Sequence, residues 1–192
     1  MIPIVFLWLI AIYIFFERLL VIRSASKTPT DFNDKIRAQV LNGDVQGAKN
    51  LCRETDTPPA RMIEKGIDKL GTPLKNIEVS IENLGKIEVY RLEKNLGFLA
   101  TVSGAAPMIG FLGTVTGMIQ AFLSIAQEEG AVSPKLLSNG IYEAMVTTAA
   151  GLFVGIIAYL AYNYLITRVK KLVHLMEYNA IDFIDLLQTP KR

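Results

Sequence analysis

The chain has 192 residues, of which 51% are hydrophobic and 20% are charged, and its formal net charge is +2. Its mean hydropathy of +0.34 is unusual for a soluble domain, so a membrane protein is the first class to consider. The small net charge and the absence of a basic block argue against nucleic-acid binding. The single cysteine, Cys52, excludes an internal disulfide, and the single histidine, His174, belongs to no metal-binding motif.

Three long stretches of the chain carry no charged residue: Met1–Phe16, Asn95–Gln127 and Ala144–Thr167. A helix needs about 20 mostly apolar residues to cross a bilayer core. The second and third stretches meet that length, and the first meets it when extended through Ile22. The first stretch also lacks the basic start and the cleavage site of a signal peptide. The sequence therefore predicts an all-α polytopic membrane protein with three transmembrane helices.

The distribution of positive charge predicts the orientation. Of the 20 Lys and Arg residues, 13 lie from Arg23 to Lys94, whereas only Lys135 lies between the second and third spans. Because loops rich in Lys and Arg stay in the cytoplasm, the N-terminus is expected in the periplasm and the C-terminus in the cytoplasm. The expected segments are a first transmembrane helix (1–22), a cytoplasmic helical region (23–95), a second transmembrane helix (96–125), a periplasmic loop (126–139), a third transmembrane helix (140–167) and a cytoplasmic helical tail (168–192).

The cytoplasmic region reads as short helices separated by turns. Thr30 or Asp31 is expected to cap the first helix and Asp44 the second, and the prolines of TDTPPA begin a third. No helix breaker occurs from Leu74 to the start of the second span, which predicts one helix from about Leu74 to Ile125. The apolar spacing predicts that the third span continues into the tail as a long helix, and a separate amphipathic helix on the membrane surface is the alternative. No Walker A, GxGxxG or GxSxG motif occurs, so an enzyme is not expected.

The second and third spans each carry their small and polar residues on one helical face. Small residues four apart, such as Gly151 and Gly155, allow two membrane helices to pack closely. Thr114 and Thr148 lie at depths that agree within about 5 Å, which favours a shared polar lining instead. Both interpretations stay open. The two predicted faces consist of Ser103, Pro107, Gly110, Thr114, Gly117, Ala121 and Ser124 in the second span, and of Gly140, Ala144, Thr148, Gly151, Gly155, Ala158 and Tyr162 in the third.

Two further residues in the spans are candidates for a special role. Glu143 lies near the outer start of the third span. It is either a solvated residue at the membrane interface or an acidic group at the mouth of an ion path, because a carboxylate inside a membrane is costly. Pro107 lies inside the second span, where a kink is expected.

Three motifs carry a resemblance to a known family: APMIGFLGTVTGMIQAF (106–122), GIYEAMVTTAAGL (140–152) and FERLLVI (16–22). The chain resembles the MotA/TolQ/ExbB proton-channel family, and it is most similar to the ExbB and TolQ branches. The resemblance implies a homopentamer whose second and third helices line a central pore. That pore would hold a dimer of a single-span partner, ExbD or TolR, whose aspartate is essential.

The resemblance also implies roles for particular residues. Thr114 and Thr148 would face the partner's aspartate, and Glu143 would lie at the outer end of the pore. Pro107, Gly110, Gly117, Gly151 and Gly155 would serve helix packing and the kink. Protons would be the coupling ion, and no bound cofactor or metal is expected. Because the uncharged spans supply no titratable carboxylate of their own, the partner would have to bring it.

The expected function is therefore that of an ExbB-like subunit of a motor in the bacterial inner membrane. The proton-motive force would drive this motor, which would energise TonB-dependent transport across the outer membrane. A TolQ-like subunit, working through TolA in envelope constriction, is the nearest alternative. Two alternatives of other classes stay open: a passive scaffold that oligomerises through its Gly and Ala faces, and an ion channel that conducts without a partner.

Overall fold

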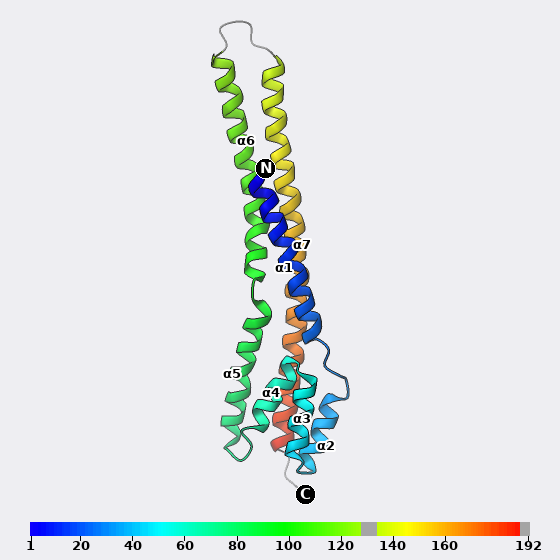
Figure 1. Cartoon of the computed structure of the whole chain (residues 1–192). Coiled ribbons are helices and arrows are strands. Elements are labelled where there is room, and N and C mark those ends of the chain that lie inside the picture. The colour runs from blue at the N-terminus through cyan, green and yellow to red at the C-terminus, as the bar shows by residue number, and fades with distance from the viewer. Residues whose placement is uncertain (128–133, 189–192) are drawn as a thin grey trace. The chain divides into compact units, whose positions relative to one another are not determined.

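The computed structural model describes residues 1–127 and 134–188 (Figure 1). Over these ranges every regular element is an α-helix, which confirms the all-α prediction. Three helical stretches in these ranges are long and apolar enough to cross a membrane: Ile2–Ala25, Leu74–Gln127 and Gly140–Gln188. The helices are α1 (Ile2–Ala25), α2 (Phe32–Leu41), α3 (Val45–Thr55), α4 (Pro58–Ile67), α5 (Leu74–Glu93), α6 (Leu96–Gln127) and α7 (Pro134–Gln188).

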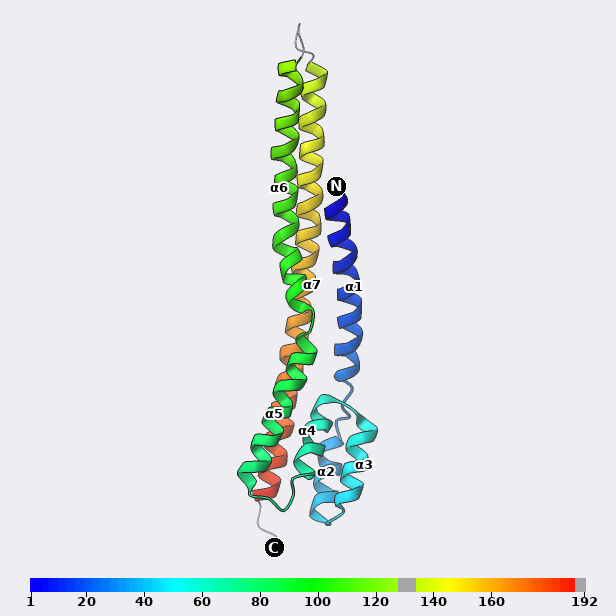
Figure 2. The same ribbon diagram turned by 60° about the vertical axis from the view of Figure 1, so that its left-hand side comes forward.

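The helices form two compact units. Unit 1 consists of the described residues of Met1–Glu17 and Asn95–Leu165, and unit 2 consists of those of Arg18–Lys94 and Ile166–Arg192. In unit 1, α6 and the first half of α7 run antiparallel, and the start of α1 lies along α7 (Figures 1 and 2).

One of the three points at which the chain passes between the units coincides with a helix break that the sequence analysis missed. The expected uninterrupted helix from Leu74 to Ile125 is wrong, because α5 ends at Glu93 and α6 begins at Leu96. Lys94 is extended, with ψ 134°, and Asn95 has a left-handed φ of 65°. Asparagine adopts this conformation more readily than most residues, so the chain can leave the helix there without proline or glycine.

The three short helices of unit 2 form where turns and prolines separate them. The side chain of Asp44 accepts a hydrogen bond from the backbone N–H of Gly47 at 2.9 Å, which confirms it as the cap of α3. Asp31, one of the two expected residues, occupies the N-cap position of α2, but its side chain makes no capping hydrogen bond. Asp31 instead pairs with Lys35 at 2.6 Å, and this hydrogen bond lowers the pKa of the Asp31 carboxyl.

Unit 2 contains a buried carboxylate, Glu88 on α5, which is 1% exposed. Arg61 of α4 donates to both of its oxygens, at 3.1 and 2.7 Å, and Arg91 donates to one of them at 2.9 Å. The hydrogen bond with Glu88 raises the pKa of Arg61. Arg18 donates to the backbone carbonyl of Arg91 at 3.1 Å. A buried charge requires such partners, so this cluster fixes α4, α5 and the end of α1 to one another.

Helix α7 is longer than the expected third span. It is one helix from Pro134 to Gln188, so the alternative of a separate tail helix is wrong. Because α6 reaches Gln127 and α7 begins at Pro134, helix also occupies parts of the expected loop 126–139. Residues 128–133 of that loop lie outside the described residues.

Candidate functional site

Helices α6 and α7 meet backbone to backbone in unit 1. A Cβ atom built on Gly151 would lie 2.5 Å from the carbonyl oxygen of Ala106 and 2.9 Å from the Cα of Gly110. One turn further along α7, a Cβ on Gly155 would lie 2.5 Å from the Cγ of Pro107. Larger residues would separate the helices at each of these points, so glycine permits the contact.

The same contact continues along α6 through Gly113 and Gly117. A Cβ on Gly117 would lie 3.1 Å from the Cβ of Ala144, and one on Gly113 would lie 2.7 Å from the Oγ1 of Thr147. The predicted face of the second span omits Gly113, although the GxxGxxxG spacing in α6 marks Gly110, Gly113 and Gly117. The structure brings together at this contact Pro107, Gly110, Gly117, Gly151 and Gly155, and α6 continues as a helix through Pro107.

Thr148 joins the two helices at the centre of this contact. Its hydroxyl donates a hydrogen bond to the backbone carbonyl of Gly110 at 2.9 Å, across α7 and α6. The half-buried Thr148 side chain also lines a groove of about 560 Å³ between the two helices. The other residues that line this groove are apolar: Pro107, Met108, Phe111, Leu112, Val115 and Leu152. Thr148 is therefore the one residue with a polar side chain among those that line this groove.

Thr114 is near this groove but is not joined to Thr148. Its hydroxyl donates to the carbonyl of Phe111 on its own helix, at 2.6 Å. Thr114 follows Gly110 by four residues, so the two threonines are offset by about 6 Å along the helices. They thus occupy neighbouring turns, and their hydroxyls bind different backbone carbonyls.

Seven serine and threonine hydroxyls of α6 and α7 share one property. Each of the seven donates its only proton to a backbone carbonyl within 3.2 Å. A hydroxyl whose proton is used in this way can only accept a hydrogen bond from a third group. While these bonds are made, the wall around Thr148 and Thr114 can receive a hydrogen bond from a proton donor but offers none to an anion. The residues concerned are Thr101, Ser103, Thr114, Thr116, Ser124, Thr147 and Thr148.

Glu143 is exposed on α7, one turn before Thr147. Its backbone carbonyl accepts a hydrogen bond from the Thr147 hydroxyl at 3.2 Å. Its carboxylate has no ion-pair partner among the described residues, so the structure leaves it accessible and does not bring it to Thr148.

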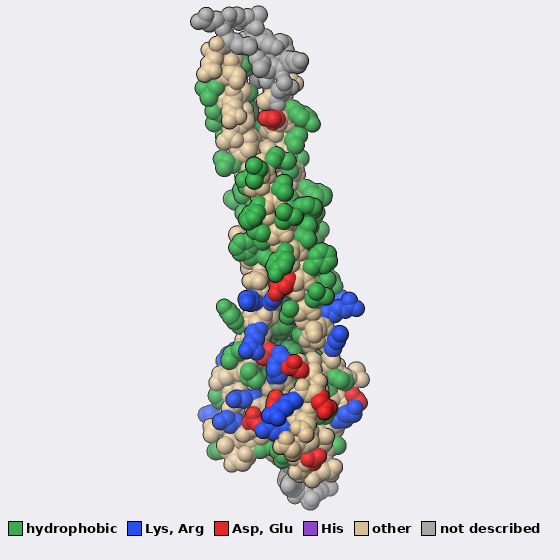
Figure 3. Space-filling model, viewed as in Figure 1, with side chains coloured by type: hydrophobic (Ala, Val, Ile, Leu, Met, Phe, Trp, Pro, Cys, Tyr) green, Lys and Arg blue, Asp and Glu red, His purple; other side chains and the backbone are tan. Residues whose placement is uncertain are grey.

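Large apolar side chains cover the outer surface of unit 1. On the face drawn in Figure 3, hydrophobic side chains dominate the surface of this unit, whereas Lys, Arg, Asp and Glu gather over unit 2. The exposed residues of α6 include Met108, Phe111, Leu112, Val115, Met118, Ile119, Phe122 and Leu123. Such a surface requires lipid or further protein around it.

The described residues contain no group of three or more His, Cys, Asp or Glu side chains that could hold a metal ion. His174 is exposed on α7, and its Nδ1 atom contacts Glu177 at 3.3 Å. Cys52 is buried in α3, and this burial raises the pKa of its thiol to about 12. A thiol with this pKa is a poor nucleophile at neutral pH.

The family model described as the MotA/TolQ/ExbB proton channel family matches residues 54–178. The chain belongs to this family. The matched range contains the α6–α7 contact and both threonines of the groove region. The chain is therefore a membrane protein of a proton-channel family, which is not a known class of enzyme.

Individual relatives come from both branches that the motifs indicated. The chain is 39% identical over 102 residues to the Tol-Pal system protein TolQ of Haemophilus influenzae, an alignment that covers 53% of this chain and 42% of the relative. It is 41% identical over 87 residues to the biopolymer transport protein ExbB of Neisseria gonorrhoeae, with coverages of 45% and 39%. The ExbB protein of Aquifex aeolicus is 39% identical over 90 residues, with coverages of 47% and 59%. The chain spans less than two thirds of each of these relatives.

Proposed function

We propose that the chain is an ExbB-like subunit of an inner-membrane motor driven by the proton-motive force. In this proposal several copies, five by analogy with the family, surround a dimer of an ExbD-like single-span partner. The partner transmits work to a TonB-like protein and so energises transport across the outer membrane. The excess of Lys and Arg in 23–94 supports a cytoplasmic location for that region and a periplasmic N-terminus.

The acceptor-only wall around Thr148 is the observation that carries the proposal. α6 has no charged residue, and α7 has none from Ala144 to Thr167, so these segments cannot relay a proton through carboxylates of their own. A partner's carboxyl group beside Thr148 could donate a hydrogen bond to Oγ1 only while it is protonated. The apolar groove likewise favours the neutral form of that acid.

The same geometry supports protons as the coupling ion. A sodium ion that leaves water needs several oxygen ligands in place of its hydration shell. The groove provides one side-chain oxygen, that of Thr148, among apolar residues. A proton carried on a neutral carboxylic acid needs no set of oxygen ligands, because it is covalently bound to the acid. No cofactor is part of this proposal.

The test is proton flux through the chain reconstituted with its partner in liposomes that contain a pH-sensitive dye. Thr148→Val should assemble normally and abolish flux, because valine keeps the shape of the side chain but removes the oxygen. Thr148→Ser should retain flux. Thr116→Val is the matched control, because Thr116 donates to Leu112 and Gly113 on its own helix and does not line the groove.

The decisive variant combines Thr114→Val and Thr148→Val. Undiminished flux in this double variant would show that neither hydroxyl takes part in the proton path. A conducting preparation of the chain alone would instead identify a free-standing channel, since the motor requires the partner's carboxyl.

Two alternative functions make different predictions. A TolQ-like role in the Tol-Pal system rests on the same site, and the relatives named TolQ and ExbB match the chain at similar identity. Complementation of strains that lack either system distinguishes these two roles. A passive scaffold would associate through its Gly and Ala faces, but here those faces are occupied within one chain. Insensitivity of the function to a protonophore would favour the scaffold.

A further inference from the structure

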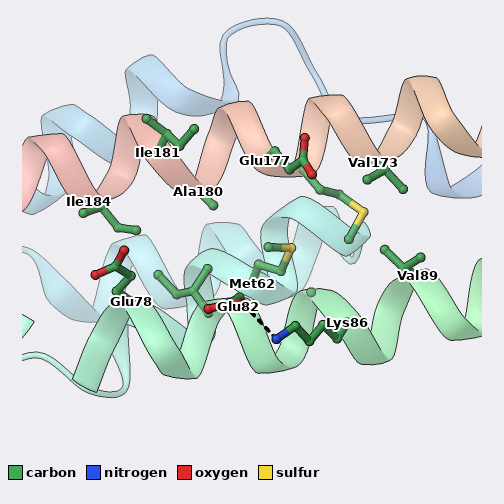
Figure 4. A pocket seen from close by; sticks show the side chains of 13 residues that line it. Met62, Glu78, Glu82, Lys86, Val89, Val173, Glu177, Ala180, Ile181 and Ile184 are labelled. Atoms are coloured by element: carbon green, nitrogen blue, oxygen red, sulfur yellow. Dashed lines mark ion pairs between the residues drawn. The ribbon is translucent and has the colours of Figure 1, made fainter. Parts of the chain in front are cut away.

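A second groove, of about 590 Å³, lies in unit 2 between α5 and the C-terminal half of α7 (Figure 4). Met62 of α4 forms part of its floor. The groove exists because the residues that face it from the two helices include small ones. Gly85 has no side chain, and a Cβ there would lie 2.9 Å from the Cε of Met62. Ala180 lines the groove from α7.

The interior of this groove is apolar, and no described segment of the chain fills it. Its inner surface comes from Ile81 and Val89 on α5 and from Val173, Met176 and Ile184 on α7. Ile181 also lines it, and this side chain is 59% exposed. An open apolar surface in a charged unit marks a place where another molecule binds. Met62 and Met176 both line the groove, and they suit such a role because methionine side chains are flexible and adapt to different shapes.

The rim of the groove is acidic. Glu78 and Glu82 line it from α5 and Glu177 lines it from α7, whereas Lys86 is the one basic residue that does so among the described residues. Lys86 already pairs with Glu82 at 2.7 Å. Glu78 has no ion-pair partner among the described residues, and Glu177 contacts only the ring of His174. Negative charge therefore exceeds positive charge around the opening.

We propose that this groove binds a basic amphipathic helix of a partner protein. Apolar side chains at helical spacing would enter between α5 and α7, and flanking Lys or Arg residues would pair with Glu78 and Glu177. Such rim charges select the partner and its orientation, while the apolar contact provides most of the affinity. This inference is independent of the proton path, because it concerns a different groove in the other unit.

A second copy of this chain is a poorer occupant. On α5 of such a copy, the exposed apolar residue Val79 lies directly beside the exposed Glu78 in sequence, and the exposed Glu82 follows three residues later. Docking that face into the groove would bring glutamates against the acidic rim. Like charges in contact at an interface cost several kcal/mol.

The test uses the full chain in nanodiscs of phosphatidylcholine, with empty nanodiscs as the background. The probes are two fluorescent amphipathic peptides with the same leucine face, one with lysine and the other with glutamate on the polar face. Binding is followed by fluorescence anisotropy. We expect the lysine peptide to bind and the glutamate peptide not to bind.

Charge variants of the rim test the proposed pairing. The double variant Glu78→Gln, Glu177→Gln should weaken binding of the lysine peptide about tenfold, or 1.4 kcal/mol. The double variant Glu54→Gln, Glu93→Gln is the matched control, since it removes equal charge from exposed positions that do not line the groove. The control should bind as the unmodified chain does.

Three results would overturn the proposal. The first is equal affinity for the glutamate and lysine peptides. The second is an affinity for the lysine peptide that does not change when Glu78 and Glu177 are replaced. The third concerns Val89→Trp, which fills the groove and should abolish peptide binding while the native mass of the assembly stays unchanged. A smaller assembly in that variant would show that another copy of the chain occupies the groove.

Discussion

Alanine at position 151 should disrupt the closest approach of α6 and α7. The added Cβ would lie 2.5 Å from the Ala106 carbonyl oxygen and 2.9 Å from the Gly110 Cα. Real Cβ atoms essentially never come within 3.0 Å of a non-bonded heavy atom from another part of the chain. Both obstacles are backbone atoms, so no side-chain rotation relieves them. The two helices must separate, which also lengthens the 2.9 Å hydrogen bond from Thr148 to Gly110.

The expected magnitude follows from three contributions. Overpacking a tight contact costs about 1–3 kcal/mol. Loss of the interhelical hydrogen bond costs about 0.6 kcal/mol in a membrane protein. Alanine offsets part of this cost, because it favours a helix over glycine by about 1 kcal/mol. Gly151→Ala should therefore destabilise the protein by about 0.6–2.6 kcal/mol.

The matched control is Gly104→Ala in the interior of α6. A Cβ at Gly104 meets nothing within 4 Å, so only the helix preference applies and stability should hold or rise. Unfolding in mixed micelles with increasing dodecyl sulfate, followed by circular dichroism, gives the free energy of unfolding for both variants. If Gly151→Ala unfolds at the same detergent fraction as Gly104→Ala, the backbones of α6 and α7 are not in contact at this point.

Three further predictions concern unit 2 and its boundary. Glu88→Gln should destabilise the chain by about 3 kcal/mol, because it leaves Arg61 without its buried partner, whereas Glu82→Gln on the exposed face of α5 should change the free energy of unfolding by less than about 0.5 kcal/mol. Burial raises the pKa of the Cys52 thiol from 9.0 to about 12, so stability from the protonated thiol is complete below pH 9 and is lost as pH rises through 12. Cys52 should accordingly resist alkylation at pH 9 in the folded chain and react once the chain is denatured; rapid reaction of the folded chain would contradict this burial. Asn95→Gly should leave stability unchanged within about 0.5 kcal/mol, whereas Asn95→Val should cost about 1–2 kcal/mol, because only the β-branched residue is strained at a φ of 65°; equal melting temperatures would rule out the left-handed break.

The sequence was a good guide wherever one physical signal dominated. The three uncharged stretches predicted the apolar helices, because no other structure satisfies backbone hydrogen bonds within a membrane. Asp44 was identified as a cap because a carboxylate directly before a helix accepts its free N–H groups. The helical wheel grouped Gly110, Gly117, Gly151 and Gly155 correctly on facing surfaces, because α6 and the first half of α7 are regular helices.

The sequence failed where two local outcomes have nearly equal energy. Asn95 can continue a helix or end one, and no proline or other strong breaker beside it announces the left-handed φ that it adopts. Asp31 could cap α2 or pair with Lys35, and it makes the pair. The wheel also could not show that the Thr148 hydroxyl binds the carbonyl of Gly110, because a helical face does not reveal the register between two helices.

The register of α6 against α7 has a mechanical consequence. Pro107 seats against Gly155, Gly110 against Gly151, and Gly113 against Thr147, so neither helix can slide past the other without steric conflict. The α6–α7 pair therefore moves as one rigid unit. In the assembly that we propose, any motion that does work would occur between neighbouring α6–α7 pairs, or between these pairs and the partner that they enclose.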